Sequence, residues 1–441
     1  MKITKTHKFL VLTVVIIALL AYLYLTGFHL VKSLFGYDIS PRKGMELNNS
    51  GVDFLKAPAG FRISVFAENL SKPGIITFDP KGRMFVSEPQ EGKVIRIDAK
   101  NGTAGNKTTI LEGLRSPYGL AFYTDSKKNI TYLYVAETHQ VARYVYDVKN
   151  GNISESDKKQ PENIVTLPSD GGENPMRTIA FGPNYRVKPI TQGKLESESM
   201  VDDKLYVGVG SSCNVCVEDS WKKAAILESD PGGTYTAEFA GGLRDSVFFT
   251  FHPVTKEIWA TEISRDGLGN NLPPDEINII RIAGPQDEYG AKRFGWPFCY
   301  GDRIKDKTFN PTKINRVDIP QDCSQTEPPT IEIPAHSAPL GLAFITSDKW
   351  PKEWQDYLLV TYHNPSNQST PGGYKMVLYK LGKRGDVIKS ADGKPEVEDF
   401  ITGWLDGKNT LGRPLDLKFG PDGALYISDD FAGVIYRVTY E

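Results

Sequence analysis

The stretch KPGIITFDPKGRMFVSE at 72–88 contains the pattern from which the fold follows. It consists of a turn, an apolar strand that ends in Phe78, a Pro/Gly/Asp turn and a second strand. Five similar stretches follow, anchored by Phe122, Phe181, Phe251, Phe344 and Phe419. Their spacing averages about 68 residues, the size of a four-stranded unit with its loops. The sequence therefore predicts an all-β protein, a six-bladed β-propeller.

The two ends of the repeat region are expected to meet. The C-terminal stretch GVIYRVTY (433–440) can pair beside FRISVFAE (61–68), which would close the ring and remove open sheet edges. In a propeller the innermost strands begin around the central axis, so the segments just before the six phenylalanines are where chemistry is expected.

The N-terminus has a different character. Three lysines within residues 1–8 precede residues 9–28, which contain no charge. This stretch is long enough to span a bilayer, and the lysines favour a cytoplasmic N-terminus. We predict a cytoplasmic segment at 1–8, a transmembrane signal anchor at 9–28, a tether at 29–57 and an extracytoplasmic propeller at 58–441. A cleaved signal peptide and a buried core helix are the alternatives.

Charge and cysteine content limit the partners and the compartment. With 52 basic and 54 acidic residues and no basic block, the chain does not resemble a nucleic-acid-binding protein. Export would agree with Asn-x-Ser/Thr glycosylation acceptors at Asn48, Asn69, Asn101, Asn106, Asn129, Asn152 and Asn367.

Four cysteines lie outside the apolar segment, an even number that suggests two disulfides in an oxidising compartment. The local pairs Cys213–Cys216 and Cys299–Cys323 are the expected ones. The Cys-x-x-Cys spacing at 213–216 is also that of a redox motif or half a zinc site, although it follows a strand instead of opening a helix.

Basic residues recur just ahead of the predicted innermost strands. Aligned on the six phenylalanines, they are Lys72, Arg115, Arg177, Arg244 and Arg413. Such a ring suits a planar ligand with several carboxylates, because guanidinium groups bind carboxylates bidentately. The alternative is that these arginines pair with Asp245, Asp416 and Glu262 and brace the blades. His336, one residue before the same columns, is the best candidate for an imidazole facing the channel, with a structural role as its alternative.

Several long motifs resemble the glucose/sorbosone dehydrogenase family. They include SPYGLAF, MRTIAFGP, GLRDSVFFTFHP, FGWPFCYGD and GRPLDLKFGPDGALYISDD, and the resemblance covers residues 58–441. It implies a six-bladed propeller that binds pyrroloquinoline quinone (PQQ) and Ca²⁺ and oxidises sugars. The implied cofactor-binding positions are Arg115, Arg177, Arg244, Asp245, His336 and Arg413.

The chain departs from the family at catalytic positions. Asn174 stands where the family has its catalytic histidine, and an amide cannot take a hydroxyl proton. The neighbouring Glu173 could act instead as the base, with Arg244 stabilising charge on the cofactor. Asp245 replaces the family's amide beside Arg244. The family's calcium carbonyls correspond to Ser264 and Arg265, within a segment rich in oxygen ligands that runs on through 266–276.

Two functional hypotheses follow. The first is a membrane-anchored PQQ-dependent sugar or aldose dehydrogenase, with a sugar or aldehyde as substrate and an unidentified electron acceptor. The second is a catalytically silent propeller that binds a carbohydrate or a protein at the cell surface. The matching motifs favour the first hypothesis, and the missing histidine favours the second.

Overall fold

The computed structural model describes residues 52–100, 102–168, 172, 174–185, 202–281, 292–314, 319–363 and 372–441. The predicted anchor at 9–28, Glu173 and most of the predicted tether lie outside these residues. Within them, no helix is both long and apolar enough to cross a membrane. The segment Asn49–Glu441 forms one compact unit.

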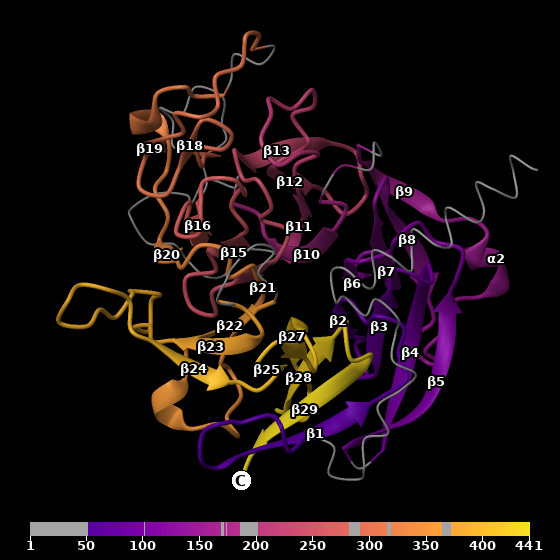
Figure 1. Ribbon diagram of the computed structural model, residues 1–441. Coiled ribbons are helices and arrows are strands. Elements are labelled where there is room, and N and C mark those ends of the chain that lie inside the picture. The colour runs from indigo at the N-terminus through magenta and orange to yellow at the C-terminus, as the bar shows by residue number, and fades with distance from the viewer. Residues whose placement is uncertain are drawn as a thin grey trace, which may run out of the picture. The chain divides into compact units, whose positions relative to one another are not determined.

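The unit is built from six antiparallel sheets, so the predicted six-bladed propeller is confirmed (Figure 1). Blade 1 contains β2 (Ile76–Phe78), β3 (Met84–Glu88), β4 (Lys93–Lys100) and β5 (Thr103–Leu111). Blade 2 contains β6 (Leu120–Asp125), β7 (Ile130–Glu137), β8 (Gln140–Tyr146) and β9 (Glu162–Thr166). Blade 3 contains β10 (Arg177–Pro183), β11 (Asp202–Val209), β12 (Ala225–Ser229) and β13 (Thr236–Gly241), with β17 (Lys292–Arg293) added in parallel.

The other three blades follow the same plan. Blade 4 contains β14 (Phe249–Phe251), β15 (Ile258–Glu262), β16 (Asp275–Ile280) and β20 (Ile331–Ile333). Blade 5 contains β21 (Pro339–Phe344), β22 (Leu358–Tyr362), β23 (Lys375–Tyr379) and β24 (Val397–Ile401). Blade 6 contains β27 (Pro414–Phe419), β28 (Leu425–Asp429), β29 (Val434–Tyr440) and β1 (Phe61–Ala67). Each anchoring phenylalanine lies on the first strand of its blade.

Short elements complete the described chain. They are α2 (Glu155–Lys158), the strand pairs β18 (Cys299–Tyr300) with β19 (Ile304–Lys305) and β25 (Leu405–Asp406) with β26 (Asn409–Thr410), and the 3₁₀ turns Cys323–Gln325 and Lys352–Trp354.

The six first strands form a closed ring around the axis. Each of them contacts the first strand of the next blade, and the last, β27, contacts β2. Blade 6 is completed by β1, which pairs with the C-terminal β29 in the register Phe61↔Tyr440 to Ala67↔Ile435. The predicted closure between the chain ends is therefore confirmed, and in Figure 1 the indigo β1 lies beside the yellow β29.

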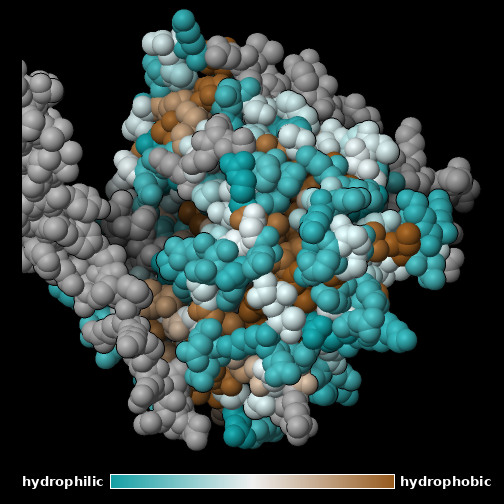
Figure 2. Space-filling model, turned by 90° about the vertical axis from the view of Figure 1, so that its right-hand side faces the viewer, coloured by the Kyte–Doolittle hydropathy of each residue, from teal (hydrophilic) through white to brown (hydrophobic). Residues whose placement is uncertain are grey.

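The hydrophobic core lies between neighbouring blades. One cluster joins blades 2 and 3 through Tyr134, Val165, Val207 and Leu227, and clusters of the same kind fill the other gaps. Because both faces of a blade are covered, inner strands such as β7 are buried along almost their whole length. The outer face over blades 1 and 2 is mostly hydrophilic, with apolar residues in narrow strips (Figure 2).

Candidate active site

The turns that precede the first strands are fixed by carboxylates at the ends of the second strands. Glu88, the last residue of β3, accepts a hydrogen bond from the backbone N–H of Ser71 at 2.8 Å. Glu137, which ends β7, accepts from Arg115 N at 2.6 Å. In blade 4, Glu262 at the end of β15 accepts from Arg244 N at 2.6 Å.

Each donor lies seven residues before its anchoring phenylalanine. The carboxylates thus place these polar and basic residues at one end of the axis, as the alignment of the six stretches predicted. Of these glutamates, Glu262 was considered only as a possible partner of the arginines, and Glu88 and Glu137 were missed at the sequence level. The signal was present, because the second-strand sequences MFVSE, YLYVAE and IWATE all end in Glu.

Arg244 is held by the chain around it. Its Nε donates to Asn214 O at 3.1 Å, Nη1 donates to Ile263 O at 3.1 Å and Nη2 donates to Asn214 Oδ1 at 3.3 Å. The guanidinium is buried and therefore ties the loop after β11 to the end of β15. Arg244 is positioned rigidly, but much of its donor capacity is already used.

Asn174, Arg177 and Asp245 lie close to Arg244, so the structure brings the predicted residues of blades 3 and 4 together. Arg177 Nη1 donates to Asn174 O at 2.7 Å. A Cβ atom placed on Gly210 would come within 2.6 Å of Asp245 Oδ1 and 2.7 Å of Asn174 Cβ. The charges of Arg244 and Arg177 both act on Asp245.

Asp245 is the electrostatically unusual member of this group. Its side chain is buried, and Oδ1 has no hydrogen-bond partner among the described residues. Burial raises the pKa of Asp245 to about 6, against the opposing effect of the Arg244 and Arg177 charges. A buried carboxylate oxygen without a partner is a costly feature for a fold to keep, unless another group binds there.

Asn214, which sequence reasoning missed, organises the loop beside Arg244. Its Oδ1 accepts from Asp266 N at 2.8 Å, and its Nδ2 donates to Asp266 O at 3.0 Å. Its carbonyl also accepts from Trp296 Nε1 at 3.3 Å. The residue lies inside the Cys213–Cys216 bridge, so the disulfide constrains the loop that holds Arg244.

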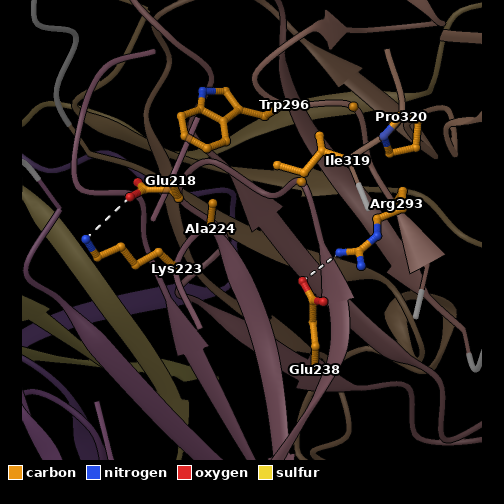
Figure 3. Close-up of a pocket in the computed structure, with 10 residues that line it drawn as sticks. Glu218, Lys223, Ala224, Glu238, Arg293, Trp296, Ile319 and Pro320 are labelled. Atoms are coloured by element: carbon orange, nitrogen blue, oxygen red, sulfur yellow. Dashed lines mark hydrogen bonds and ion pairs between the residues drawn. The ribbon is translucent and has the colours of Figure 1, made fainter. Parts of the chain in front are cut away.

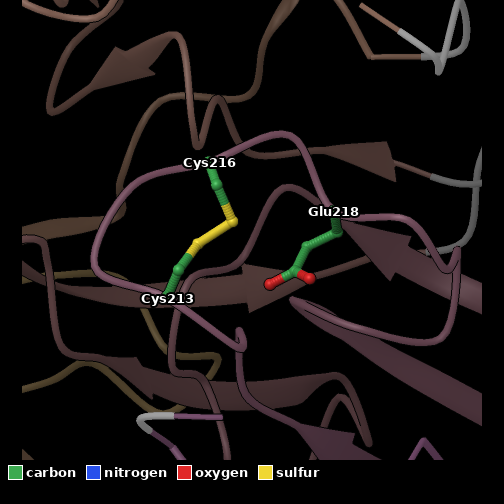
Figure 4. A group of neighbouring side chains, drawn as sticks. All are labelled: Cys213, Cys216 and Glu218. Carbon is green, nitrogen blue, oxygen red and sulfur yellow. A yellow bond between two sulfur atoms is a disulfide. The ribbon is translucent and has the colours of Figure 1, made fainter. Parts of the chain in front are cut away.

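Both predicted disulfides, Cys213–Cys216 and Cys299–Cys323, are present. Figure 4 shows the Cys213–Cys216 bridge beside Glu218. Both carboxylate oxygens of Glu218 accept hydrogen bonds from Ser212, one from its backbone N and one from its Oγ. Because the two sulfurs are bonded to each other, neither is a thiolate that could bind zinc, and the bridge is structural in this state.

His336 contacts the segment that follows the predicted calcium carbonyls in the chain. His336 Nδ1 lies 3.1 Å from Asp266 Oδ1 and Nε2 lies 2.9 Å from Gly269 O, so both ring nitrogens face oxygen. Ser264 N donates to Asp275 at 2.9 Å, and the Arg265 guanidinium forms an ion pair with Asp306 at 2.7 Å.

Asp275, another residue missed at the sequence level, accepts hydrogen bonds on both carboxylate oxygens. In addition to Ser264 N, it accepts from Ala338 N at 2.9 Å and so joins blade 4 to blade 5. Burial raises the pKa of Asp275 to about 7, although these backbone N–H groups act in the opposite direction.

Arg413 belongs to a second cluster, formed by blades 5 and 6. Its Nε and Nη2 donate to the two carboxylate oxygens of Asp430 at 2.9 and 2.7 Å. His363 Nε2 lies 3.1 Å from Asp430 Oδ1. Burial opposes ionisation of Asp430, but His363 and Arg413 outweigh it and lower its pKa to about 2.

Tyr118 of blade 2 places this cluster at the axis. The charges of Asp430 and Arg413 affect the pKa of Tyr118, which is raised mainly by burial. Blade 1 separates blade 2 from blade 6 in the ring, so these residues can approach one another only across the central channel. Arg115, from the same turn as Tyr118, is exposed, and its guanidinium makes no hydrogen bond or ion pair in the described part of the protein.

A pocket at blade 3 is lined by Glu218, Lys223, Glu238, Arg293 and Trp296, among others. Its ionic groups are compensated, because Glu218 lies 3.5 Å from Lys223 and Glu238 lies 2.6 Å from Arg293. Figure 3 shows the two pairs, with Trp296 above them. The pocket therefore offers less uncompensated charge to a ligand than the axis does.

Comparison with known proteins agrees with this geometry. A family model described as TrAA12-like matches residues 55–441. An uncharacterized protein of Borreliella burgdorferi is 32% identical over 394 residues, which cover 88% of this chain and 91% of that protein.

Solved structures show the same fold. The calcium structure of the Trichoderma reesei family AA12 carbohydrate-active enzyme superposes with a TM-score of 0.70 at 21% identity, over 89% of this chain and 99% of that one. The holo form of the pyranose dehydrogenase PQQ domain from Coprinopsis cinerea superposes with a TM-score of 0.67 at 19% identity, over 87% and 97%. These matches confirm the predicted resemblance, and the chain belongs to the TrAA12-like family.

Proposed function

We propose that the protein is a quinone-dependent dehydrogenase that uses PQQ and Ca²⁺ to oxidise a sugar or a related aldose. The observation that carries this proposal is the collection of cationic and acidic side chains at one end of the axis, within a chain of the TrAA12-like family. One relative is named as the PQQ domain of a pyranose dehydrogenase and another was solved with calcium, which supports both cofactors.

The axial residues fit an anionic planar ligand. The guanidinium of Arg115 is uncommitted in the described part of the chain, and Arg413 uses only Nε and Nη2 for Asp430, which leaves Nη1. These donors would hold the carboxylates of PQQ. Arg177 and Arg244 bind backbone carbonyls, so we assign them mainly to shaping the site. A ring donor or protonated group of the cofactor would give Asp245 Oδ1 the partner it lacks.

The calcium prediction also fits the local backbone. The carbonyls on either side, of Ile263 and Asp266, accept hydrogen bonds from Arg244 and Asn214. No described residue donates to the carbonyls of Ser264 and Arg265. Carbonyl oxygens are ordinary calcium ligands, so these two remain the proposed ones.

The chemistry divides between cofactor and protein. PQQ, when bound, supplies an acceptor for the hydride of the substrate C–H bond. The chain must orient the sugar, exclude water and take up the hydroxyl proton. Asn174 cannot accept that proton, and its Nδ2 is already committed to Ser211 Oγ at 3.0 Å.

The test is a titration of the full-length protein with PQQ and Ca²⁺, followed by absorbance, and then addition of sugars. We expect a bound-quinone spectrum and its reduction by sugar. Arg115→Ala should weaken PQQ binding roughly 10- to 100-fold with little change in Tm, because its exposed guanidinium has no hydrogen bond or ion pair with the described residues to lose. Arg62→Ala is the matched control, since the Arg62 side chain is 71% exposed and, among the described residues, forms its ion pair with Glu441.

Failure to bind PQQ would reject this function and favour the silent carbohydrate- or protein-binding propeller. Loss of sugar-dependent reduction after treatment with EDTA, and its recovery on adding Ca²⁺, would support the calcium part of the proposal. Unchanged reduction after complete calcium removal would contradict it.

A further inference from the structure

The proposed reaction needs a proton acceptor, and no described residue of the third blade has been found to supply one. Asn174 has no basic nitrogen, and Glu173 lies outside the described residues. We propose that His363, at the end of β22 in blade 5, is the catalytic base, with Asp430 and Arg413 as the residues that orient it. This inference rests on the proposed function.

The position of His363 follows from the fold. It comes directly after β22, and its backbone N donates to Ala338 O at 3.0 Å, immediately before β21 begins. It therefore lies at the end of the blade where the first strands start, which is the same end as Asn174 and Arg244. Asp430 occupies the corresponding place after β28, lies beside His363, and its charge acts on Tyr118 of blade 2.

The hydrogen bonds assign a tautomer to His363. The doubly bound Arg413 keeps Asp430 ionised, and an ionised carboxylate can only accept hydrogen bonds. A neutral imidazole facing it must therefore carry its proton on Nε2, which leaves the lone pair on Nδ1. Nδ1 makes no hydrogen bond with the described residues, and it is not one of the buried polar atoms that lack a partner, so it remains accessible. The accessible nitrogen, Nδ1, is thus the one that can accept a proton.

This arrangement has the logic of a carboxylate–histidine pair in other enzymes, in which the acid fixes the ring and stabilises the imidazolium that forms. Burial lowers the pKa of His363, while Asp430 raises it and Arg413 lowers it further. The ring is therefore neutral near pH 7 and ready to accept a proton. Asp429, Tyr118 and Tyr374 are further titratable groups beside the Asp430–Arg413 pair.

The reaction balances with the quinone as oxidant. The substrate O–H bond breaks and its proton moves to His363 Nδ1, while the C–H bond breaks and its hydride, with two electrons, moves to the quinone. A carbon–oxygen double bond forms in the sugar. The proton on His363 then leaves to solvent, for which the ring keeps 14% of its side-chain surface exposed.

The first measurement needs no cofactor. In full-length protein labelled with ¹⁵N-histidine, long-range ¹H–¹⁵N spectra at pH 7 should show His363 protonated on Nε2 alone, with His363→Gln used to assign the signals. A neutral ring protonated on Nδ1, or an imidazolium at this pH, would overturn the proposal.

The second measurement uses PQQ-loaded protein. His363→Gln keeps an N–H for Asp430 but has no basic nitrogen, so it should bind PQQ with wild-type absorbance and lose at least 100-fold in kcat. The acid limb of its pH profile should disappear. In His363→Ala, added imidazole should restore turnover, which a purely structural role would not allow. His363→Gln with activity within threefold of wild type would refute the assignment.

The outcomes separate the two proposals. If wild-type protein binds PQQ but oxidises no sugar, the dehydrogenase function fails and the base role fails with it. If wild type is active and His363→Gln is active too, only the His363 assignment fails.

Discussion

Asp245 is a single residue that departs from the usual protein interior, in which buried charges are paired and buried polar atoms are hydrogen-bonded. The resembled family has an amide at this position, whereas here a carboxylate is buried beside two arginines, and its Oδ1 has no hydrogen-bond partner among the described residues. Two nearby guanidinium groups do not fully offset the desolvation, because both donate to backbone carbonyls.

Asp245→Asn should stabilise the apoprotein at neutral pH. The folded-state pKa of about 6 lies above the value of about 3.9 for an exposed Asp, so folding favours the protonated acid. The stability that protonation provides is complete below about pH 4 and is lost as pH rises through 6. The variant should therefore gain about 2–3 kcal/mol at pH 7.5 and little at pH 4.

Thermal unfolding at both pH values measures this difference. Asp302→Asn, at a side chain that is 76% exposed, is the control and should change Tm little at either pH. An equal effect of Asp245→Asn at pH 4 and pH 7.5 would show that burial of the ionised Asp245 carboxylate does not destabilise the fold.

At the scale of elements, the loops between strands place the site, and two disulfides restrain them. Cys213–Cys216 encloses Asn214, whose side chain and carbonyl reach Arg244, Asp266 and Trp296. Cys299–Cys323 closes part of the long excursion between β16 and β20 of blade 4, and both cysteines are buried. We therefore expect Cys213–Cys216 to hold the loop beside Arg244 in place and Cys299–Cys323 to contribute mainly to the stability of the fold.

Removing the two bridges should therefore have different effects. Cys299→Ser with Cys323→Ser opens a loop with a sequence separation of 24 and should cost about 3–4 kcal/mol. Cys213→Ser with Cys216→Ser opens a loop with a separation of 3 and should cost about 2 kcal/mol or less, but it should weaken PQQ binding. Urea unfolding measures the stability of the two double variants, and titration with PQQ measures their affinity for the quinone. Equal stability losses with equal PQQ affinity would contradict this division.

At the scale of the whole molecule, the propeller depends on closure between distant parts of the chain. Phe61 of β1 packs at 4.8 to 5.1 Å from the rings of Trp350, Trp354, Phe400 and Tyr440. The strand that completes blade 6 is thereby fixed to blade 5 as well, which protects the last sheet edge.

Phe61→Ala should destabilise the closed ring by about 2–4 kcal/mol, because one aromatic ring supports four others. Phe431→Ala is the control of the same chemistry at a site that is 56% exposed, where a change within about 0.5 kcal/mol is expected. Equilibrium unfolding of both variants would decide, and similar losses would show that closure does not depend on this cluster.

The predicted topology is also a property of the whole chain. We expect residues 9–28 to anchor the protein, with the propeller outside the cytoplasm where disulfides form. Protease added to intact cells should release a large soluble fragment that retains both disulfides. A propeller that stays fully protected until the cells are lysed would reject this orientation.

The sequence by itself determined the six blades, their first strands, the pairing of the chain ends and both disulfides. These features are encoded locally, because turn residues and alternating apolar strands recur within each repeat and the paired cysteines are near in sequence. It also indicated which turns meet at the axis. The glutamates that fix those turns could have been found from the strand endings.

Only the tertiary structure decided how the axial side chains are used. Arg244 donates its hydrogen bonds to Asn214 and Ile263. Asp430 joins Arg413 and His363 in one network. Both arrangements depend on distances between segments that are far apart in the sequence. Side chains separated by 67 residues, as His363 and Asp430 are, meet only once every blade has its place around the ring. A repeat pattern fixes where a turn lies, but which donor reaches which acceptor there is set by packing across the channel.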